Sequence, residues 1–449
     1  MKKLISLGNM FAFLMLVIAV TFFTACSDSN DTPDVSSSSV KVSVKLASEY
    51  NKVALGKVNL TLRNVNSGKE TSVEVGTNGI ATVDNLPVDM YDVTATYKMS
   101  AEDYKTATGT TTEVTDSVLF SASATGVQLE PDKVKELSLE LSTASTDDFV
   151  IKTIYYAGSD NKKAAGENDQ FIEIYNNTNR VLYADSLCIA VTTMNRYGNG
   201  HKWQDKRYYY TEDGRYDWSK SQDMKDVDGA NAKYYYAKML FMVPGKGKDY
   251  PIQPGQSFII AAFAQNYKAA FTTSTGKQIT PEAPELTVDL SKAEFDVVYE
   301  GYETLDNPNA ANMTIIHKGN NKYMRLSRNG KEGYVIFRHS NPASLPVYLY
   351  PAIDPAKGSK DQFMQVPNAN VIDAVEVITP TADGYVAPKA FQKKDDAGYT
   401  YSKPDYSSMC ITRKVSRVDG TRKVLQDINN STLDFVEMKA DPKAFAPQQ

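Results

Sequence analysis

The residues that could carry catalysis are few and lie far apart in the sequence. The histidines are His201, His317 and His339, and neither an H-E-x-x-H nor a G-x-S-x-G pattern occurs. His317 and His339 each follow an apolar run, which is typical of a residue at a strand end rather than of a general base. The sequence therefore predicts no catalytic residue, no metal site and no cofactor.

Two further groups of reactive side chains give weak support for chemistry. Residues 226–229 read Asp-Val-Asp-Gly, like part of a calcium loop, but the remaining ligand spacing of an EF-hand is missing. Cys188 and Cys410 lie in separate apolar runs and belong to no C-x-x-C motif or cysteine–histidine cluster. They could pair in an oxidising compartment, but two separately buried thiols fit their surroundings better.

The residues best suited to bind a ligand gather between about 194 and 248, a segment that contains both tryptophans of the chain. Aromatic rings with a polar edge suit glycans, flat aromatic ligands or a protein partner. The candidate ligand-binding residues are Tyr197, Trp203, Tyr208, Tyr210, Tyr216, Trp218 and Tyr235. The alternative is that these rings only pack the segment onto the sheet beneath it, because a long insertion needs a core of its own.

The charge balance excludes some partners. The chain has 49 basic and 54 acidic side chains and a formal net charge of −5. A mild acidic excess argues against a nucleic-acid partner and against attraction to anionic lipid head groups. The length of 449 residues predicts two or three domains.

The N-terminal residues predict export. Two lysines precede an apolar run at 11–23 that is too short for a comfortable membrane span, although an uncleaved helical anchor is the alternative. Residues 23–26, Phe-Thr-Ala-Cys, resemble a lipobox. This resemblance implies a lipoprotein signal peptide over residues 1–25 and a lipid on Cys26 that attaches the protein to a membrane. Residues 26–39 are acidic and serine-rich, which predicts a disordered tether.

Residues 40–145 predict a first β-sandwich. Apolar and polar residues alternate at 40–46 and 58–62, and short turn signals containing asparagine and glycine separate such segments. Residues 79–95 resemble the carboxypeptidase-regulatory, or prealbumin-like, module. In that module a glycine turn leads a strand, a leucine-proline corner follows, and a tyrosine opens the next strand. The resemblance implies a spacer or an adhesive unit.

Residues 146–449 predict a second β-sandwich. The segment 170–178 reads Gln-Phe-Ile-Glu-Ile-Tyr-Asn-Asn-Thr and is similar to the signature of the lamin tail domain, an immunoglobulin-like sandwich. Segments 252–261, 371–377 and 427–435 resemble later parts of that domain, in order. An ordinary lamin tail domain is far shorter, so the resemblance implies large insertions. These insertions fall at about 194–248, 266–321 and 340–368.

The fold class predicted for the whole chain is all-β, with two β-sandwich domains, and the arrangement resembles an uncharacterised family of Bacteroidota lipoproteins. In the lamin-tail pattern Glu173 and Asp185 have structural roles. The family resemblance implies an outer-membrane lipoprotein that faces the cell exterior. It would act as a binding or accessory protein, beside a TonB-dependent transporter, and capture a glycan or small nutrient.

This reading predicts that Trp203→Ala or Trp218→Ala weakens binding and leaves folding intact. Two other functions stay open. One is a structural or adhesive envelope protein that binds glycan, host or matrix surfaces. The other, with less support, is a hydrolase.

Overall fold

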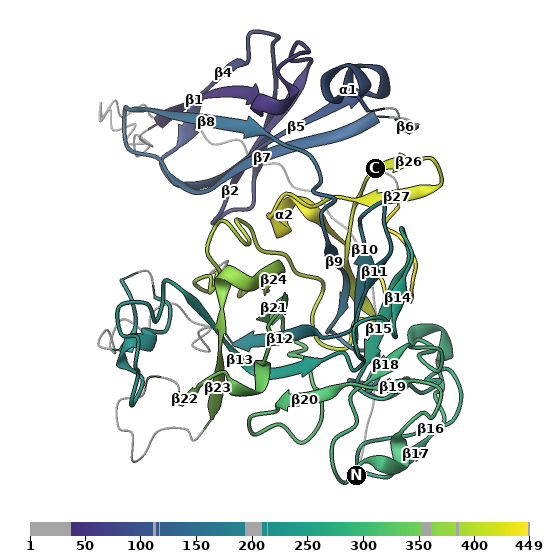
Figure 1. Cartoon of the computed structure of the whole chain (residues 1–449). Helices are drawn as coiled ribbons and strands as arrows, with labels where there is room; N and C mark the ends of the chain where they lie inside the picture. The colour runs from purple at the N-terminus through teal and green to yellow at the C-terminus, as the bar shows by residue number, and fades with distance from the viewer. Residues whose placement is uncertain are drawn as a thin grey trace, which may run out of the picture.

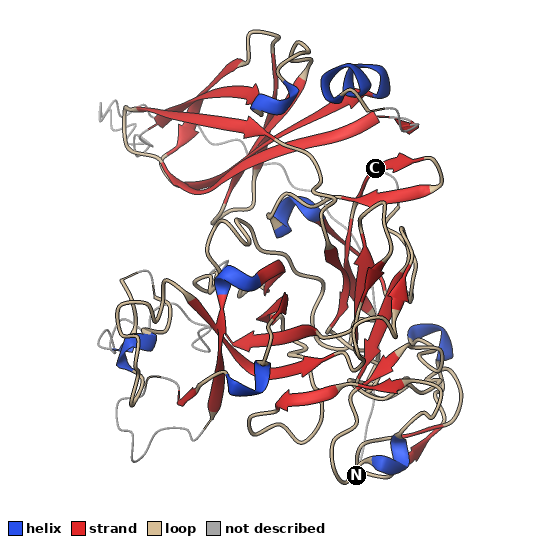
Figure 2. Ribbon diagram, viewed as in Figure 1, coloured by secondary structure: helices blue, strands red, loops and turns tan. Residues whose placement is uncertain are grey.

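The computed structural model describes residues 37–110, 114–115, 117–193, 209–212, 214–349, 351, 361–382 and 386–447. Strands occur along the whole of this part of the chain, separated by loops, and the helices are short (Figure 2). The strands form two stacked bodies, an N-terminal sandwich and a larger second sandwich (Figure 1). The prediction of an all-β fold built from sandwiches is confirmed. The lipobox and the tether to residue 36 lie outside the described residues.

The N-terminal sandwich consists of two facing sheets. The β1 sheet has the order β4-β1-β8, and the β5 sheet has the order β3-β2-β5-β7. The strands are β1 (Ser37–Leu46), β2 (Val58–Asn64), β3 (Glu70–Val75), β4 (Ile80–Pro87), β5 (Met90–Ser100), β7 (Ser117–Gln128) and β8 (Val134–Leu141). Alternation in β1 sends Val40, Val42 and Val44 into the core, while Lys41 and Ser43 between them face outward.

The second sandwich consists of two larger sheets. The β9 sheet has the order β19-β18-β15-β10-β9-β25-β28, and the β12 sheet has the order β22-β23-β13-β12-β21-β24, with β20 also paired to β13. The β9-sheet strands are β9 (Phe149–Tyr155), β10 (Phe171–Asn176), β15 (Ser257–Ala261), β18 (Phe295–Asp296), β19 (Ala311–Asn312), β25 (Met409–Arg413) and β28 (Phe435–Lys439). Those of the β12 sheet are β12 (Leu187–Thr193), β13 (Tyr234–Met242), β20 (Thr314–His317), β21 (Lys331–Arg338), β22 (Val347–Leu349), β23 (Gln362–Pro367) and β24 (Val371–Ile378).

The central strands of the second sandwich are covered on both faces. Every residue of β9, β10 and β12 is buried. One face of each sheet fills the core between the sheets, and loop segments cover much of the outer faces. This coverage explains why apolar residues predominate in these strands without a regular apolar–polar alternation.

The sequence analysis placed residues 234–242 inside an insertion and did not identify the strand that they form. These residues form β13, an interior strand that pairs with β12 on one side and with β20 and β23 on the other. Because the strand is buried on both faces, its sequence lacks the alternation that would have identified it. The other two predicted insertions contain strands that extend the sheets, since β18 and β19 lengthen the β9 sheet and β22 and β23 lengthen the β12 sheet.

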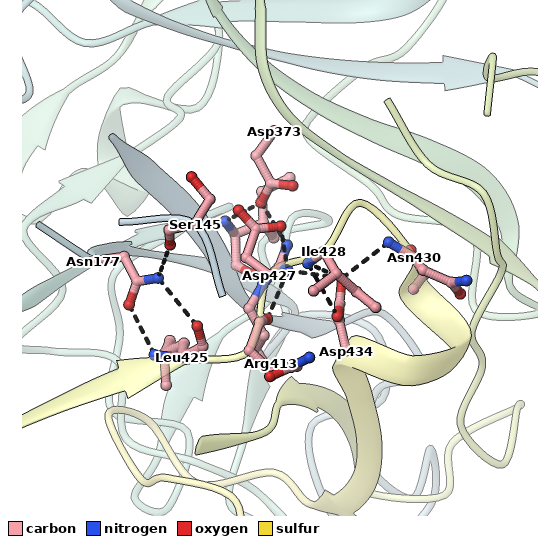
Figure 3. Close-up of polar contacts among 12 residues, drawn as sticks. Ser145, Asn177, Asp373, Arg413, Leu425, Asp427, Ile428, Asn430 and Asp434 are labelled. Atoms are coloured by element: carbon pink, nitrogen blue, oxygen red, sulfur yellow. Dashed lines mark hydrogen bonds and ion pairs between the residues drawn. The ribbon is translucent and has the colours of Figure 1, made fainter. Parts of the chain in front are cut away.

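Arg413, at the end of β25, is the largest fully buried side chain in the described residues. Its Nη2 donates to Asp373 Oδ2 on β24 at 2.6 Å, and its Nη1 donates to Asp427 at 3.0 Å and Asp434 at 3.3 Å (Figure 3). Its Nε donates to the carbonyl of Ile151 on β9 at 3.0 Å. The guanidinium therefore joins the two sheets and residues 426–434, which we call the closing segment. Burial of three carboxyls around one cation raises the pKa of Asp373 to about 7.

The segment that follows Arg413 also attaches the N-terminal sandwich. The strand β6 (Val114–Thr115) of the N-terminal sandwich pairs with β26 (Val415–Asp419), which forms a hairpin with β27 (Arg422–Leu425). Gln426 Nε2 donates to Ser121 Oγ at 3.1 Å, and the Asn430 amide donates to Ser123. The Arg417 guanidinium lies 5.3 Å from the ring centroid of Tyr104. Strand pairing and side-chain contacts thus join the two sandwiches.

The cysteines are separate and buried. Cys188 lies on β12 and Cys410 on β25, both with free thiols, in different apolar clusters. The prediction of two separately buried thiols is confirmed. Burial raises the pKa of the Cys188 thiol to about 12, so that thiol stays protonated and unreactive at neutral pH. Among the described residues, no helix is long and apolar enough to cross a bilayer.

We predict that Arg413→Leu destabilises the second sandwich by about 3–5 kcal/mol, because it leaves buried carboxyls without their cation. Urea unfolding measures this loss of stability, and hydrogen exchange of the β9, β24 and β25 amides shows where in the sandwich it occurs. The control is Lys41→Leu, which removes an exposed ion pair to Glu136 at 3.0 Å and costs less than about 1 kcal/mol. Equal unfolding midpoints for the two variants would contradict the role of Arg413.

Candidate functional site

The described residues of 194–248 that precede β13, which we call the aromatic segment, pack into a cluster against β13 and β23. The Trp218 ring stacks on Tyr236 of β13 with centroids 3.7 Å apart and planes 8° apart. Phe363 of β23 meets the indole edge-on at 5.5 Å, and the rings of Tyr210 and Tyr216 stack at 5.4 Å. These rings are buried, and Trp218 is only 6% exposed. The cluster is a small core that attaches the segment to the β12 sheet.

Polar contacts hold the loop in this position. The Asn231 side chain accepts a hydrogen bond from the backbone N–H of Trp218 at 2.9 Å and donates to the carbonyl of Tyr216 at 2.7 Å. Asp217 accepts from the N–H of Ser219 at 3.1 Å and so caps the short helix at Trp218–Lys220. One side-chain amide therefore fixes both aromatic residues relative to each other.

A small hollow lies beside this cluster. It is lined by residues of the loop and of β12 and β13, among them Thr192, Arg215, Trp218 and Tyr235. Its volume is about 30 Å³. That is room for about two water molecules, far below the ~300–1,000 Å³ of a usual ligand pocket.

Tyr235 projects from β13 into a different group of residues. Its hydroxyl donates to Asp395 Oδ2 at 2.5 Å, and its ring lies 4.7 Å from that of Phe391. Burial raises the pKa of Tyr235. Glu376 on β24 anchors the same loop, because it accepts from the N–H groups of Ala390 and Phe391. Burial raises the pKa of Glu376 to about 7.

The structure thus sorts the candidate ligand-binding residues into groups. Tyr210, Tyr216 and Trp218 pack together, and Tyr235 belongs to a separate cluster. Tyr197, Trp203 and Tyr208 lie outside the described residues. Because the indole stacks on Tyr236 of the sheet, we now expect Trp218→Ala to disturb folding, in place of the expectation that it leaves folding intact.

Two larger hollows, which the sequence did not reveal, border Gln362 at the start of β23. One has a volume of about 390 Å³ and is lined by residues 299–300, 315–319 and 362. The other has a volume of about 300 Å³ and is lined by Gln222, Asp223, Lys225, Pro346, Val347, Tyr348, Leu349 and Gln362. Val347 is 39% exposed on β22, which ends the β12 sheet within the described residues. We call the surface formed by the lining residues of these two hollows the insertion edge.

The histidine at the insertion edge has a structural contact. His317 ends β20, and its Nε2 lies 2.9 Å from the carbonyl oxygen of Gln362. Burial lowers the pKa of His317, so the ring is neutral at pH 7. His339 directly follows β21. The strand-end positions predicted for these two histidines are confirmed.

The conspicuous acidic residues serve the framework. Glu173 on β10 is paired with the buried Lys152 at 2.8 Å and accepts from the Ser257 hydroxyl at 2.5 Å. Asp185 accepts from three backbone N–H groups, those of Gly247, Asp249 and Tyr250.

Asp226, in the calcium-like stretch, accepts from the N–H of Gly229, the ammonium of Lys233 and the hydroxyl of Tyr234. These donors lower its pKa. Within the described ranges, no group of three or more His, Cys, Asp or Glu side chains is placed to hold a metal ion.

Comparison with known proteins extends this picture. Residues 253–442 match DUF4876, a family described as a protein of unknown function. A crystal structure of a DUF4876 protein from Bacteroides thetaiotaomicron aligns over 89% of this chain and 94% of its own, with 24% identity and a TM-score of 0.48. The DUF4876 range includes Arg413 with its three carboxyl partners, and also Val347 and Gln362.

Two further structures are more distant. A streptococcal ancillary pilin aligns over 57% of this chain and 62% of its own, with 12% identity and a TM-score of 0.16. A Bacteroides eggerthii protein provisionally described as a cell adhesion protein aligns over 52% of this chain and 81% of its own, with 9% identity and a TM-score of 0.16. A comparison with curated proteins finds no match.

We predict that Trp218→Ala destabilises the packing of the aromatic segment by about 3–5 kcal/mol, because it removes a buried ring from a packed cluster. Faster hydrogen exchange at 209–236, with unchanged exchange in the N-terminal sandwich, is the expected result. Val227→Ala is the matched control, since Val227 lies in the same segment and is 53% exposed; its effect stays within about 0.5 kcal/mol. Native exchange rates in Trp218→Ala would instead show that the ring is dispensable for packing.

Proposed function

We propose that this chain is an outer-membrane lipoprotein, anchored through Cys26, that binds a partner protein at the insertion edge of its second sandwich. In this proposal the N-terminal sandwich is a prealbumin-like stalk, and the second sandwich is an expanded lamin-tail-like domain. The first partner class to test is a TonB-dependent transporter, for which the protein would serve as an accessory in nutrient capture.

The observation that carries the proposal is the position and make-up of the insertion edge. The two larger hollows share Gln362, at the start of β23, as a lining residue. The strands β22 and β23 lie on a side of the second sandwich that faces away from the N-terminal sandwich (Figure 1). Segments that the sequence marks as insertions build most of this edge. Insertions on a rigid sandwich are where binding surfaces usually form.

The chemistry of the insertion edge suits a protein partner. The exposed Val347 lines one hollow together with Asp223 and Lys225, and Glu300 and Lys318 line the other, so the edge combines an apolar side chain with charges of both signs. Apolar contacts combined with polar and charged ones are the usual anatomy of a protein interface. Within the described residues β22 is also an edge strand, so its outer backbone groups can pair with a strand from a partner.

Binding also fits the buried polar groups better than catalysis does. Arg413, Glu173 and Asp185 are each engaged with strands or turns of the framework. His317 is held at a backbone carbonyl. These contacts support a framework that presents a surface. The second candidate function, adhesion to glycan or host surfaces, draws support from the aromatic composition of the segment at 194–248.

The test is capture of partners from detergent-solubilised outer membranes, with the lipidated protein tagged after Gln449 as bait. Val347→Arg places a charge on the insertion edge, and we expect it to lower recovery of the partner at least about tenfold. Val134→Arg is the matched control, because Val134 is 58% exposed on β8 of the stalk; it leaves recovery unchanged.

Recovery of a transporter barrel that Val347→Arg abolishes would support the transporter assignment. Equal recovery with both variants would reject the insertion edge as the binding surface. Retention on glycan or cell surfaces, with no membrane partner recovered from folded bait, would favour the adhesive function instead.

A further inference from the structure

The first strand of the N-terminal sandwich lies between two neighbours that hold it along most of its length. The strand β1 pairs with β8 in parallel through eight registered residue pairs, from Ser39 with Val134 to Leu46 with Leu141. On its other side β1 pairs with β4 in antiparallel register through six pairs. The first described strand is therefore the middle strand of its sheet.

The chain enters and leaves this sheet at opposite ends. Because β1 and β8 are parallel, the start of β1 lies beside the start of β8, and the end of β8 lies beside the end of β1. After Leu141 the chain continues through residues 142–148, which we call the linker, to β9 (Figure 1). A pull on the chain before Ser37, opposed by a pull on the linker, acts along the strands and shears them past each other.

We propose that the N-terminal sandwich is a force-bearing stalk in which β1, sheared between β4 and β8, is the mechanical clamp. This inference rests on the proposed function, since a protein anchored at its N-terminus and bound at its second sandwich carries load along this path. A shearing load strains all the hydrogen bonds of a ladder together. A load that separates one end of a ladder breaks them one pair at a time.

The packing of the core also opposes sliding of β1. Val40 and Val42 are fully buried, whereas Lys41 between them faces solvent. A slip of one residue would turn the valines outward and force a lysine into the core. The registered pairs Lys41–Glu136 at 3.0 Å and Lys45–Glu140 at 2.7 Å add exposed ion pairs along the same ladder.

Hydrogen bonds to β7 also hold the chain where it leaves β8. Ser121 of β7 and Ser142 exchange backbone hydrogen bonds at 2.9 and 3.1 Å, and the Thr143 hydroxyl donates to the carbonyl of Leu119 at 2.7 Å. Load that arrives through the linker is therefore shared between β8 and β7. The β1 ladders are left as the contacts that must break before the anchored end of the chain separates from the stalk.

The test is single-molecule extension of the full chain from residue 27 onward, pulled in two directions. In both, one handle is at the N-terminus. Asp147→Cys places the second handle in the linker and shears the ladder, whereas Lys135→Cys places it at the start of β8 and unzips the same ladder. Both positions are exposed, and Cys188 and Cys410 are buried, so a thiol-reactive handle attaches at the new cysteine.

We expect the rupture force at one loading rate to be several-fold higher for the Asp147→Cys handle than for the Lys135→Cys handle. Equal rupture forces, in two proteins with the same urea unfolding midpoint, would overturn the clamp. The extension needs no partner, so failure to capture a partner leaves this result standing. Conversely, partner capture with equal rupture forces would reject only the clamp.

Discussion

The buried ion pairs of Arg413 are the interaction on which the rest of the architecture depends. One guanidinium holds Asp373 of the β12 sheet, Asp427 and Asp434 of the closing segment, and the backbone of the β9 sheet. Removing one partner from such a network leaves uncompensated charge in the interior, so the contacts are retained or lost together. The same closing segment attaches the N-terminal sandwich through Gln426. The same segment therefore joins the two sheets of the second sandwich and attaches the N-terminal sandwich.

This framework explains how the chain can accommodate the long segments that the sequence analysis predicted to be insertions. The central strands are buried on both faces and fixed by side chains far apart in sequence, so added segments do not disturb their register. The insertions instead add short strands at the sheet edges or pack as separate clusters, as the rings around Trp218 do. A surface built in this way can change without cost to the core.

The sequence predicted the parts of the fold that local patterns determine. The alternation of β1 identifies a strand without further information, whereas the segment of β10 was identified by its resemblance to the lamin-tail signature. The strand β13 was missed because burial on both faces removes its alternation, and three consecutive tyrosines resemble a binding segment. The role of Trp218 could not be read either, since stacking on Tyr236 depends on a loop returning to its own sheet. The hollows at Gln362 are assembled from separated segments and give no local signal.

The central claim is that the insertion edge contacts a partner in the intact envelope. Its most direct test is photo-crosslinking in living cells with a photoreactive amino acid in place of Gln362, which is exposed between the two hollows. The same residue in place of the exposed Lys135 of the stalk is the comparison. We expect a discrete crosslinked protein from position 362 and none from position 135. Crosslinks from position 135 alone, or from neither position in properly exported protein, would contradict it.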